Sequence, residues 1–253
     1  MKIYIFADLE GISGVSGIEY VDGALAAVGR ELMAGDINAC AAACFDAGAT
    51  EVVVRDGHSS GVNFPITSLD PRCYLVQGAV AGKRFPGIEG STAIILLGYH
   101  AMAGTAGAIL EHTYSSRTIM NVLLNGRRVG EIGIDAAIAA EYGCAVAMVS
   151  GDDKACAEAA EFVPEAVRCC VKEAYAVGCG KMMPLAAARR LIADSTKRAL
   201  ANLPAAPKPL SPATVRWELV ERCPVPLESP GCRVIDARTY ERTSETVERA
   251  FLG

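Results

Sequence analysis

The hydrophobic positions of the chain form short apolar runs that alternate with helically spaced segments. Lys2–Ala7 is an apolar, aromatic-rich run that predicts a buried strand. Apolar residues then recur at helical spacing from Leu25 to Cys44, and Gly48 marks the end of that helix. Glu51–Arg55 is a second run of strand length. The order strand, helix, strand predicts a parallel sheet covered by helices.

The same alternation continues along the rest of the chain. Ala108–Tyr114 and Ile119–Asn125 are predicted to pair as a hairpin, and Asn125-Gly126 is a turn signal beyond them. Further strands are expected over Cys73–Val76, Thr92–Leu97, Cys144–Val149 and Thr214–Val220. Helices are expected over Val129–Tyr142, Asp152–Phe162, Pro184–Asn202 and Ser244–Leu252.

One linker-like stretch, Ala205–Pro212, divides this pattern into two parts. Residues 1–204 are predicted to form the α/β core, which carries the candidate functional residues. Residues 213–253 form a β/α extension that is too small to fold alone, so we expect it to pack on the core or at a subunit interface. The expected fold class is α/β: a mostly parallel central sheet covered by helices, with a smaller C-terminal α+β portion.

Composition narrows the kinds of partner. Hydrophobic residues make up 51% of the 253 residues, which excludes a disordered chain. A net charge of −5 and a pI near 5.3 argue against binding to nucleic acid or to an anionic membrane. The N-terminus does not resemble a signal peptide, so we expect a cytoplasmic protein.

The chain has ten cysteines, but none stands in a Cys-x-x-Cys pair. This spacing argues against a zinc ribbon and against a thioredoxin-like redox site. Most of the cysteines are therefore expected to be small buried hydrophobic residues.

Candidate chemistry begins directly after the first strand. Asp8 and Glu10 are spaced i, i+2, which places both carboxylates on one face of an extended chain. Carboxylates this close repel each other unless a proton or a cation lies between them. The alternative is a solvated strand end, but Gly11 follows and allows a ligand or a backbone to approach closely.

Two histidines follow other predicted strands. His58 lies in Asp56-Gly57-His58, and His100 follows the apolar run in Gly98-Tyr99-His100. Because the carboxyl ends of parallel strands share one edge, we expect both histidines to meet Asp8 and Glu10 there. Carboxylates and imidazoles suit Zn²⁺ or a similar ion, and a shared carboxylate suits a two-metal hydrolytic site.

Glu131 stands between glycines at the start of a predicted helix. The helix dipole alone also favours an acidic residue there, so a purely structural role explains Glu131 by itself about as well as a metal role does, and its flanking glycines favour the metal role.

Five segments in this order resemble the D-aminopeptidase family of M55 metallopeptidases. They are Asp8–Gly14, Asp56–Ser59, Gly98–Ala101, Val129–Gly133 and Gly151–Asp153. The resemblance implies two zinc ions held by Asp8, Glu10, His58, His100 and Glu131, with Asp8 bridging. It also implies that His112 is the catalytic residue, and that the chain assembles as a homodecamer that removes N-terminal D-amino acids such as D-Ala from short peptides.

Two alternatives remain beside this interpretation. One is a di-metal hydrolase of another amide, an ester or a phosphate ester. The other is a metal-binding oligomeric protein without catalysis, which would hold metal but turn over no peptide. Asp56 and Glu111 are candidate anchors for the substrate ammonium, or partners that orient a histidine.

Overall fold

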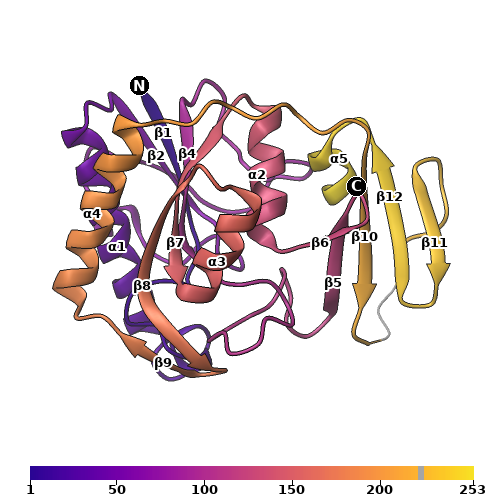
Figure 1. The fold of residues 1–253 in the computed structure, drawn as a ribbon, viewed down its shortest axis with the longest axis horizontal. Coiled ribbons are helices and arrows are strands. Elements are labelled where there is room, and N and C mark those ends of the chain that lie inside the picture. Colours follow the sequence, from indigo (N-terminus) through magenta and orange to yellow (C-terminus); the bar gives the residue numbers. More distant parts are fainter. Residues whose placement is uncertain (222–224) are drawn as a thin grey trace.

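Two sheets build the chain, shown in Figure 1 as a computed structural model that describes residues 1–221 and 225–253. The larger sheet has seven strands in the order β3-β2-β1-β4-β7-β8-β9. Its strands are β1 (Lys2–Ala7), β2 (Glu51–Asp56), β3 (Tyr74–Val76), β4 (Ala93–Tyr99), β7 (Ala145–Asp152), β8 (Val167–Ala176) and β9 (Cys179–Met182). Neighbours from β3 to β8 are parallel, and only the β8–β9 pair of this sheet is antiparallel. The predicted mostly parallel sheet is confirmed.

Helices cover both faces of this sheet (Figure 1). The helices are α1 (Ala26–Asp46), α2 (Glu131–Glu141), α3 (Asp153–Phe162), α4 (Leu185–Ala201) and α5 (Val247–Leu252), with short 3-10 helices at Ile18–Tyr20 and Ile66–Ser68. Alternate residues of β1 enter opposite cores: Ile5 packs with α1 and α4, and Tyr4 packs with α2 and α3. Burial on both faces explains why β1 is an uninterrupted apolar run.

The smaller sheet has five antiparallel strands in the order β11-β12-β10-β5-β6. Its strands are β5 (Ile119–Leu124), β6 (Arg127–Val129), β10 (Ala213–Leu219), β11 (Cys232–Asp236) and β12 (Thr239–Ser244). Trp217 of β10 packs against Phe251 of α5, with ring centroids 5.1 Å apart. The sheet takes strands from both sides of Ala205–Pro212, and the domain boundary that we expect there stays a prediction.

The predicted hairpin is wrong in its first strand. Ala108–Tyr114 is a loop, and β5 instead pairs with β6 across Asn125-Gly126. Tyr114 has a φ of +60°, which a strand does not allow. The apolar residues of this segment, such as Ile109, are buried by the packing of the loop on the sheet edge rather than by strand pairing.

Other boundaries follow from local hydrogen bonds. Val129 belongs to β6, where it pairs with Val122 of β5, so α2 begins at Glu131 and not at Val129. The predicted cap is confirmed, because the Asp152 carboxylate accepts the N–H groups of Lys154 and Ala155 at the start of α3. The last helix begins after Thr246, whose hydroxyl accepts the Arg249 N–H. The strands β6, β8, β9, β11 and β12 had no counterpart in the sequence prediction.

The described part of the chain contains no helix that combines the length and the apolar character needed to cross a lipid bilayer. Most cysteines are buried, as predicted. Buried ones are Cys40, Cys44, Cys73, Cys144, Cys156 and Cys169, while Cys170 and Cys232 are half-buried and Cys179 is exposed. Cys223 lies outside the described residues.

Candidate metal centre

Polar side chains gather at the carboxyl edge of the larger sheet, where β1 and β4 are neighbours. The chain order reverses here, because β2 and β3 extend the sheet on one side of β1 and β7 and β8 extend it beyond β4. Open α/β sheets bind ligands at such a switch point. Asp8 and Glu10 follow β1, His58 follows β2, and His100 directly follows β4. The predicted convergence of these strand ends is present.

Two glycines let the chain after β1 lie against the end of β4. The Gly11 N–H donates to the carbonyl of Gly98 (2.7 Å). A Cβ on Gly11 would lie 1.9 Å from the Tyr99 carbonyl oxygen. A Cβ on Gly98, which has a φ of +75°, would lie 2.4 Å from the Asp8 carbonyl oxygen. Glycine alone permits so close an approach, so these positions fix the Asp8 backbone beside β4.

The Asp8 carboxylate lies between two imidazole rings. Nδ1 of His58 is 3.1 Å from Oδ1 of Asp8 and 3.1 Å from Oε2 of Glu10. Nε2 of His100 is 3.4 Å from Oδ2 of Asp8 and 3.3 Å from Oε1 of Glu131. Each oxygen of Asp8 therefore faces a different histidine, and all five predicted ligands form one cluster.

The donor atoms of this cluster fit a divalent cation. His100 Nδ1 lies 3.1 Å from the Ala101 carbonyl oxygen, to which only an N–H can bond, so Nδ1 carries a proton and Nε2 is the ring nitrogen left to bind either a metal ion or a second proton. Within the described residues, His100 Nε2 and Glu10 Oε2 are buried and have only these histidine–carboxylate contacts, without an aligned hydrogen bond. The buried carboxylates of this cluster repel one another, and a metal ion bound between them and the histidines would remove this repulsion.

The pKa values of the cluster also indicate a site that favours positive charge. Burial lowers the pKa of His58, but Asp8 and Glu10 outweigh it and raise this pKa to about 10. Burial also opposes the charged form of His100, yet the Glu131 and Asp8 carboxylates raise its pKa well above the usual value. Burial raises the pKa of Asp8, and the histidines reverse this to a lower value. Positive charge stabilises these buried carboxylates, and either protons or a metal ion can supply it.

His112 stacks on this cluster from the loop before β5. Its ring is parallel to that of His100, and its Nδ1 lies 3.0 Å from the Leu110 carbonyl oxygen. Nε2 of His112 is 3.9 Å from Oε1 of Glu131. His100, His112 and Glu131 offer ligand atoms within 4.8 Å of one another, as do Asp8, Glu10 and His100.

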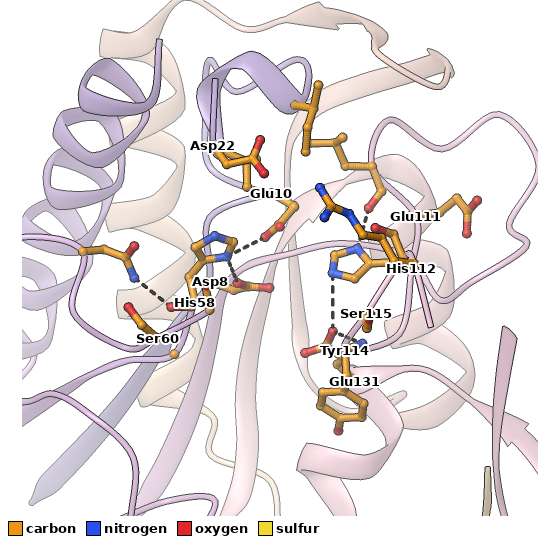
Figure 2. Close-up of a pocket in the computed structure, with 18 of the residues that line it drawn as sticks. Asp8, Glu10, Asp22, His58, Ser60, Glu111, His112, Tyr114, Ser115 and Glu131 are labelled. Atoms are coloured by element: carbon orange, nitrogen blue, oxygen red, sulfur yellow. Dashed lines mark hydrogen bonds and ion pairs between the residues drawn. The ribbon is translucent and has the colours of Figure 1, made fainter. Parts of the chain in front are cut away.

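The cluster opens into a cavity of about 810 Å³, which Figure 2 shows in close-up. Asp8, Glu10, His58, His112 and Glu131 line it, whereas His100 lies beneath its surface. The labelled side chains of His58 and His112 approach the centre from opposite sides (Figure 2). The volume lies within the usual range for small-molecule sites and admits a short peptide.

Several neighbours of Glu131 were not predicted from the sequence. Arg84 forms a bidentate pair with Asp135 (2.8 and 2.9 Å), and its Nη2 is 3.4 Å from Oε2 of Glu131. The Tyr114 N–H donates to Oε1 of Glu131 (2.8 Å). Tyr99 Oη donates to Asp135 (2.6 Å). No motif marks Arg84, because its partners lie far away along the chain.

Asp56 and Glu111, the two candidate partners of a substrate ammonium, differ in position. Asp56 is fully buried and accepts hydrogen bonds from Asn63 N (2.6 Å) and Nδ2 (2.7 Å), so it shapes the loop after His58 and is not available to a substrate. Glu111 lines the cavity and accepts the Gly104 N–H. Of the two, Glu111 alone lies where a substrate ammonium can approach.

Fold and site together define an α/β protein with a carboxylate–imidazole centre at its topological switch point, the arrangement expected of a metal-dependent hydrolase. The sequence model of the M55 peptidase family, described as D-aminopeptidase, matches residues 1–252. The chain belongs to this family of peptidases, which confirms the resemblance seen in the sequence segments.

A sequence match and a structural match, both from Bacillus subtilis, agree with this assignment. A D-aminopeptidase of strain 168 is 37% identical over 218 residues, which are 84% of this chain and 78% of that protein. A solved structure described as the Zn-dependent D-aminopeptidase DppA, a self-compartmentalizing protease, matches with a TM-score of 0.89 and 29% identity. The match covers 99% of this chain and 94% of that one, so the whole architecture is shared.

Proposed function

We propose that this chain is a zinc-dependent aminopeptidase that releases N-terminal D-amino acids of the D-Ala type from short peptides. The observation that carries the proposal is the Asp8 carboxylate between two histidines, in a buried cluster with Glu10 and Glu131. The family model and the two matches support the D-amino-acid specificity, and the name of the structural match supports zinc.

In this proposal the chain holds two zinc ions. Their ligands would be Asp8, Glu10, His58, His100 and Glu131, with Asp8 shared between the ions. Zinc bound there supplies a Lewis acid that activates water near neutral pH and polarises a carbonyl group. Tyr114 N–H and Arg84 hold the Glu131 carboxylate in place, and the Ala101 carbonyl holds the His100 ring.

His112 is the proposed catalytic residue. Because its Nδ1–H is bonded to the Leu110 carbonyl, its Nε2 is free at the cavity wall. From there Nε2 would either take a proton from the attacking water and pass it to the leaving amine or, once protonated, donate a hydrogen bond to the developing oxyanion. Glu111 is the candidate partner for the substrate ammonium.

A paired assay tests this function. Purified protein of known metal content is given D-Ala-D-Ala and L-Ala-L-Ala, before and after chelation. We expect turnover of the D-peptide alone, its loss on chelation and its return with Zn²⁺. Bound metal with neither peptide cleaved would contradict the peptidase activity and direct the search to other amides and esters, or to a role without catalysis.

The assembly and location complete the proposal. The structural relative is called self-compartmentalizing, which supports a closed homo-oligomer, and the family resemblance suggests a homodecamer. Analytical ultracentrifugation tests this directly, since a monomeric mass would contradict it. A cytoplasmic location, the absence of nucleic-acid partners and the division into residues 1–204 and 213–253 stay predictions of the sequence.

A further inference from the structure

The segment after β1 is a buried loop that carries a proposed ligand. Residues 8–16 form neither helix nor strand, yet Leu9, Ile12 and Val15 are fully buried. A buried loop has no sheet partner for its carbonyl groups, and each carbonyl without a hydrogen bond would cost free energy. Something other than a strand must therefore bind the main chain around Glu10.

The ammonium group of Lys172 fills this role. Nζ of Lys172, on β8, donates to the carbonyl oxygens of Glu10 (2.5 Å), Ile12 (3.0 Å) and Val15 (2.7 Å). The side chain is only 3% exposed, and within the described residues no carboxylate lies within ion-pair distance of Nζ. All three ammonium protons are used to bind one loop.

Burying an ammonium group without a carboxylate partner is expensive, and an apolar residue is what a strand position facing a core usually holds. The cost is offset here by three charge-assisted hydrogen bonds that converge on one nitrogen. The three hydrogen bonds span the turn that places the Glu10 side chain in the candidate metal centre. It is independent of the hydrogen bonds that Asp36 accepts from Ser13 in the same loop.

We propose that Lys172 is a positioning residue that holds Glu10 in its metal-binding orientation through the backbone of residues 10–15. The inference rests on the proposed metal centre. It acts through Glu10 and not on the substrate, so its primary signature is the affinity for metal and only secondarily the rate.

Two effects of Lys172 on metal binding have opposite signs. The hydrogen bonds preorganise Glu10 and strengthen binding, whereas the positive charge repels a cation. Substitutions separate them. Lys172→Arg keeps the charge, but its planar guanidinium cannot present three donors from one nitrogen. Lys172→Gln removes the charge and keeps an amide donor. Lys172→Met removes both the charge and the donors.

The experiment is a zinc titration of the purified protein in competition with a chromophoric chelator. We expect Lys172→Met and Lys172→Arg to weaken zinc binding by about tenfold or more, as is typical when support for a ligand is lost. Lys172→Gln should lie between these variants and wild type, because it keeps two N–H donors and loses the charge that repels the cation. Circular dichroism checks folding, and the arginine variant replaces the methionine variant if the latter does not fold. Ser13→Ala is the matched control, because it loosens the same loop away from the Glu10 carbonyl, and its zinc affinity should remain within about threefold.

Activity provides a second readout. In Lys172→Met or Lys172→Arg, kcat should return toward wild type as the zinc concentration is raised, because only ligand placement is impaired. Folded variants with wild-type zinc affinity would overturn the role of Lys172 and leave the metal centre standing. A wild-type protein that binds no zinc would overturn the metal centre, and this inference with it.

Discussion

The imidazole rings of His100 and His112 are stacked, with centroids 3.9 Å apart and planes 11° from parallel. Each ring donates its Nδ1–H to a main-chain carbonyl, that of Ala101 for His100 and that of Leu110 for His112. Both Nε2 atoms consequently face Glu131. The two histidines are therefore fixed as a pair, although only His100 is a proposed ligand.

This pairing separates the roles of the two residues by mutation. His112→Ala should retain its zinc and lose about 10²–10⁴-fold in kcat, the range typical of a proton-transfer or charge-stabilising group. His100→Ala should lose both zinc and activity. Metal analysis and steady-state kinetics on the same preparations check this. Near wild-type turnover by His112→Ala would remove it from the mechanism, and loss of its zinc would make it a ligand.

Metal removal should destabilise the fold. Without metal, the carboxylates of Asp8 and Glu10 depend on the histidines for positive charge, and Glu131 has His100 and Arg84. Zinc at about 100 times its Kd should add about 2.7 kcal/mol to the free energy of unfolding. A thermal melt recorded over a zinc series measures this. Asp8→Asn, which removes the shared charge, should show a much smaller zinc-dependent shift. Equal shifts in both proteins would argue against binding at this cluster.

Gly98→Ala tests the contact between β4 and the Asp8 backbone. The new methyl group meets the Asp8 carbonyl oxygen at 2.4 Å, and φ is +75°, so we expect a loss of roughly 3–5 kcal/mol in stability together with most of the activity. Gly126→Ala is the control, because its φ is +82° but nothing lies within 4 Å of its Cβ position. It should cost only about 1–2 kcal/mol. Urea denaturation compares the two, and similar losses would contradict the close contact.

Glu158 should make stability depend on pH. Burial raises its pKa to about 7, although the Met102 N–H that it accepts opposes the shift. A carboxyl group whose folded pKa is raised stabilises the fold fully below its unfolded pKa, and this contribution is lost as pH rises through about 7. The loss is of the order of 3 kcal/mol.

The corresponding experiment uses Glu158→Gln in the presence of chelator. Relative to wild type, this variant should gain stability between about pH 4.5 and about pH 7.5, because glutamine never ionises. Glu161→Gln, on the same helix but exposed and paired with Arg127, should follow wild type at every pH. Parallel stability curves for wild type and Glu158→Gln would show that Glu158 is not the group responsible.

The sequence predicted those elements whose burial pattern is simple. β1, β2 and β4 are apolar on both faces, and α1 repeats its apolar residues at helical spacing, so local sequence alone suffices for them. β8 was missed because charged residues, Lys172 among them, interrupt its apolar pattern. The side chain of Lys172 is nevertheless buried.

The proposed metal ligands were predicted more completely than the residues that hold them in place. Asp8, Glu10, His58 and His100 follow strands, so the rule that parallel strands end at one edge brings them together. Arg84 and Lys172 reach the cluster from segments far away in the sequence, and nothing near them indicates their partners. The stacking of His112 on His100 depends on the loop 101–118, which had been predicted in part as a strand.

The pairing of β10 with β5 has a consequence for the proposed catalytic histidine. Thr118 closes the loop that carries His112, and its carbonyl oxygen accepts the Val220 N–H at the end of β10. β10 lies about ninety residues after β5 in the chain, so the loop with His112 is tied at this end by a contact between distant segments. Strain or damage in the smaller sheet therefore reaches the proposed catalytic histidine directly, although no residue of β10 lines the cavity.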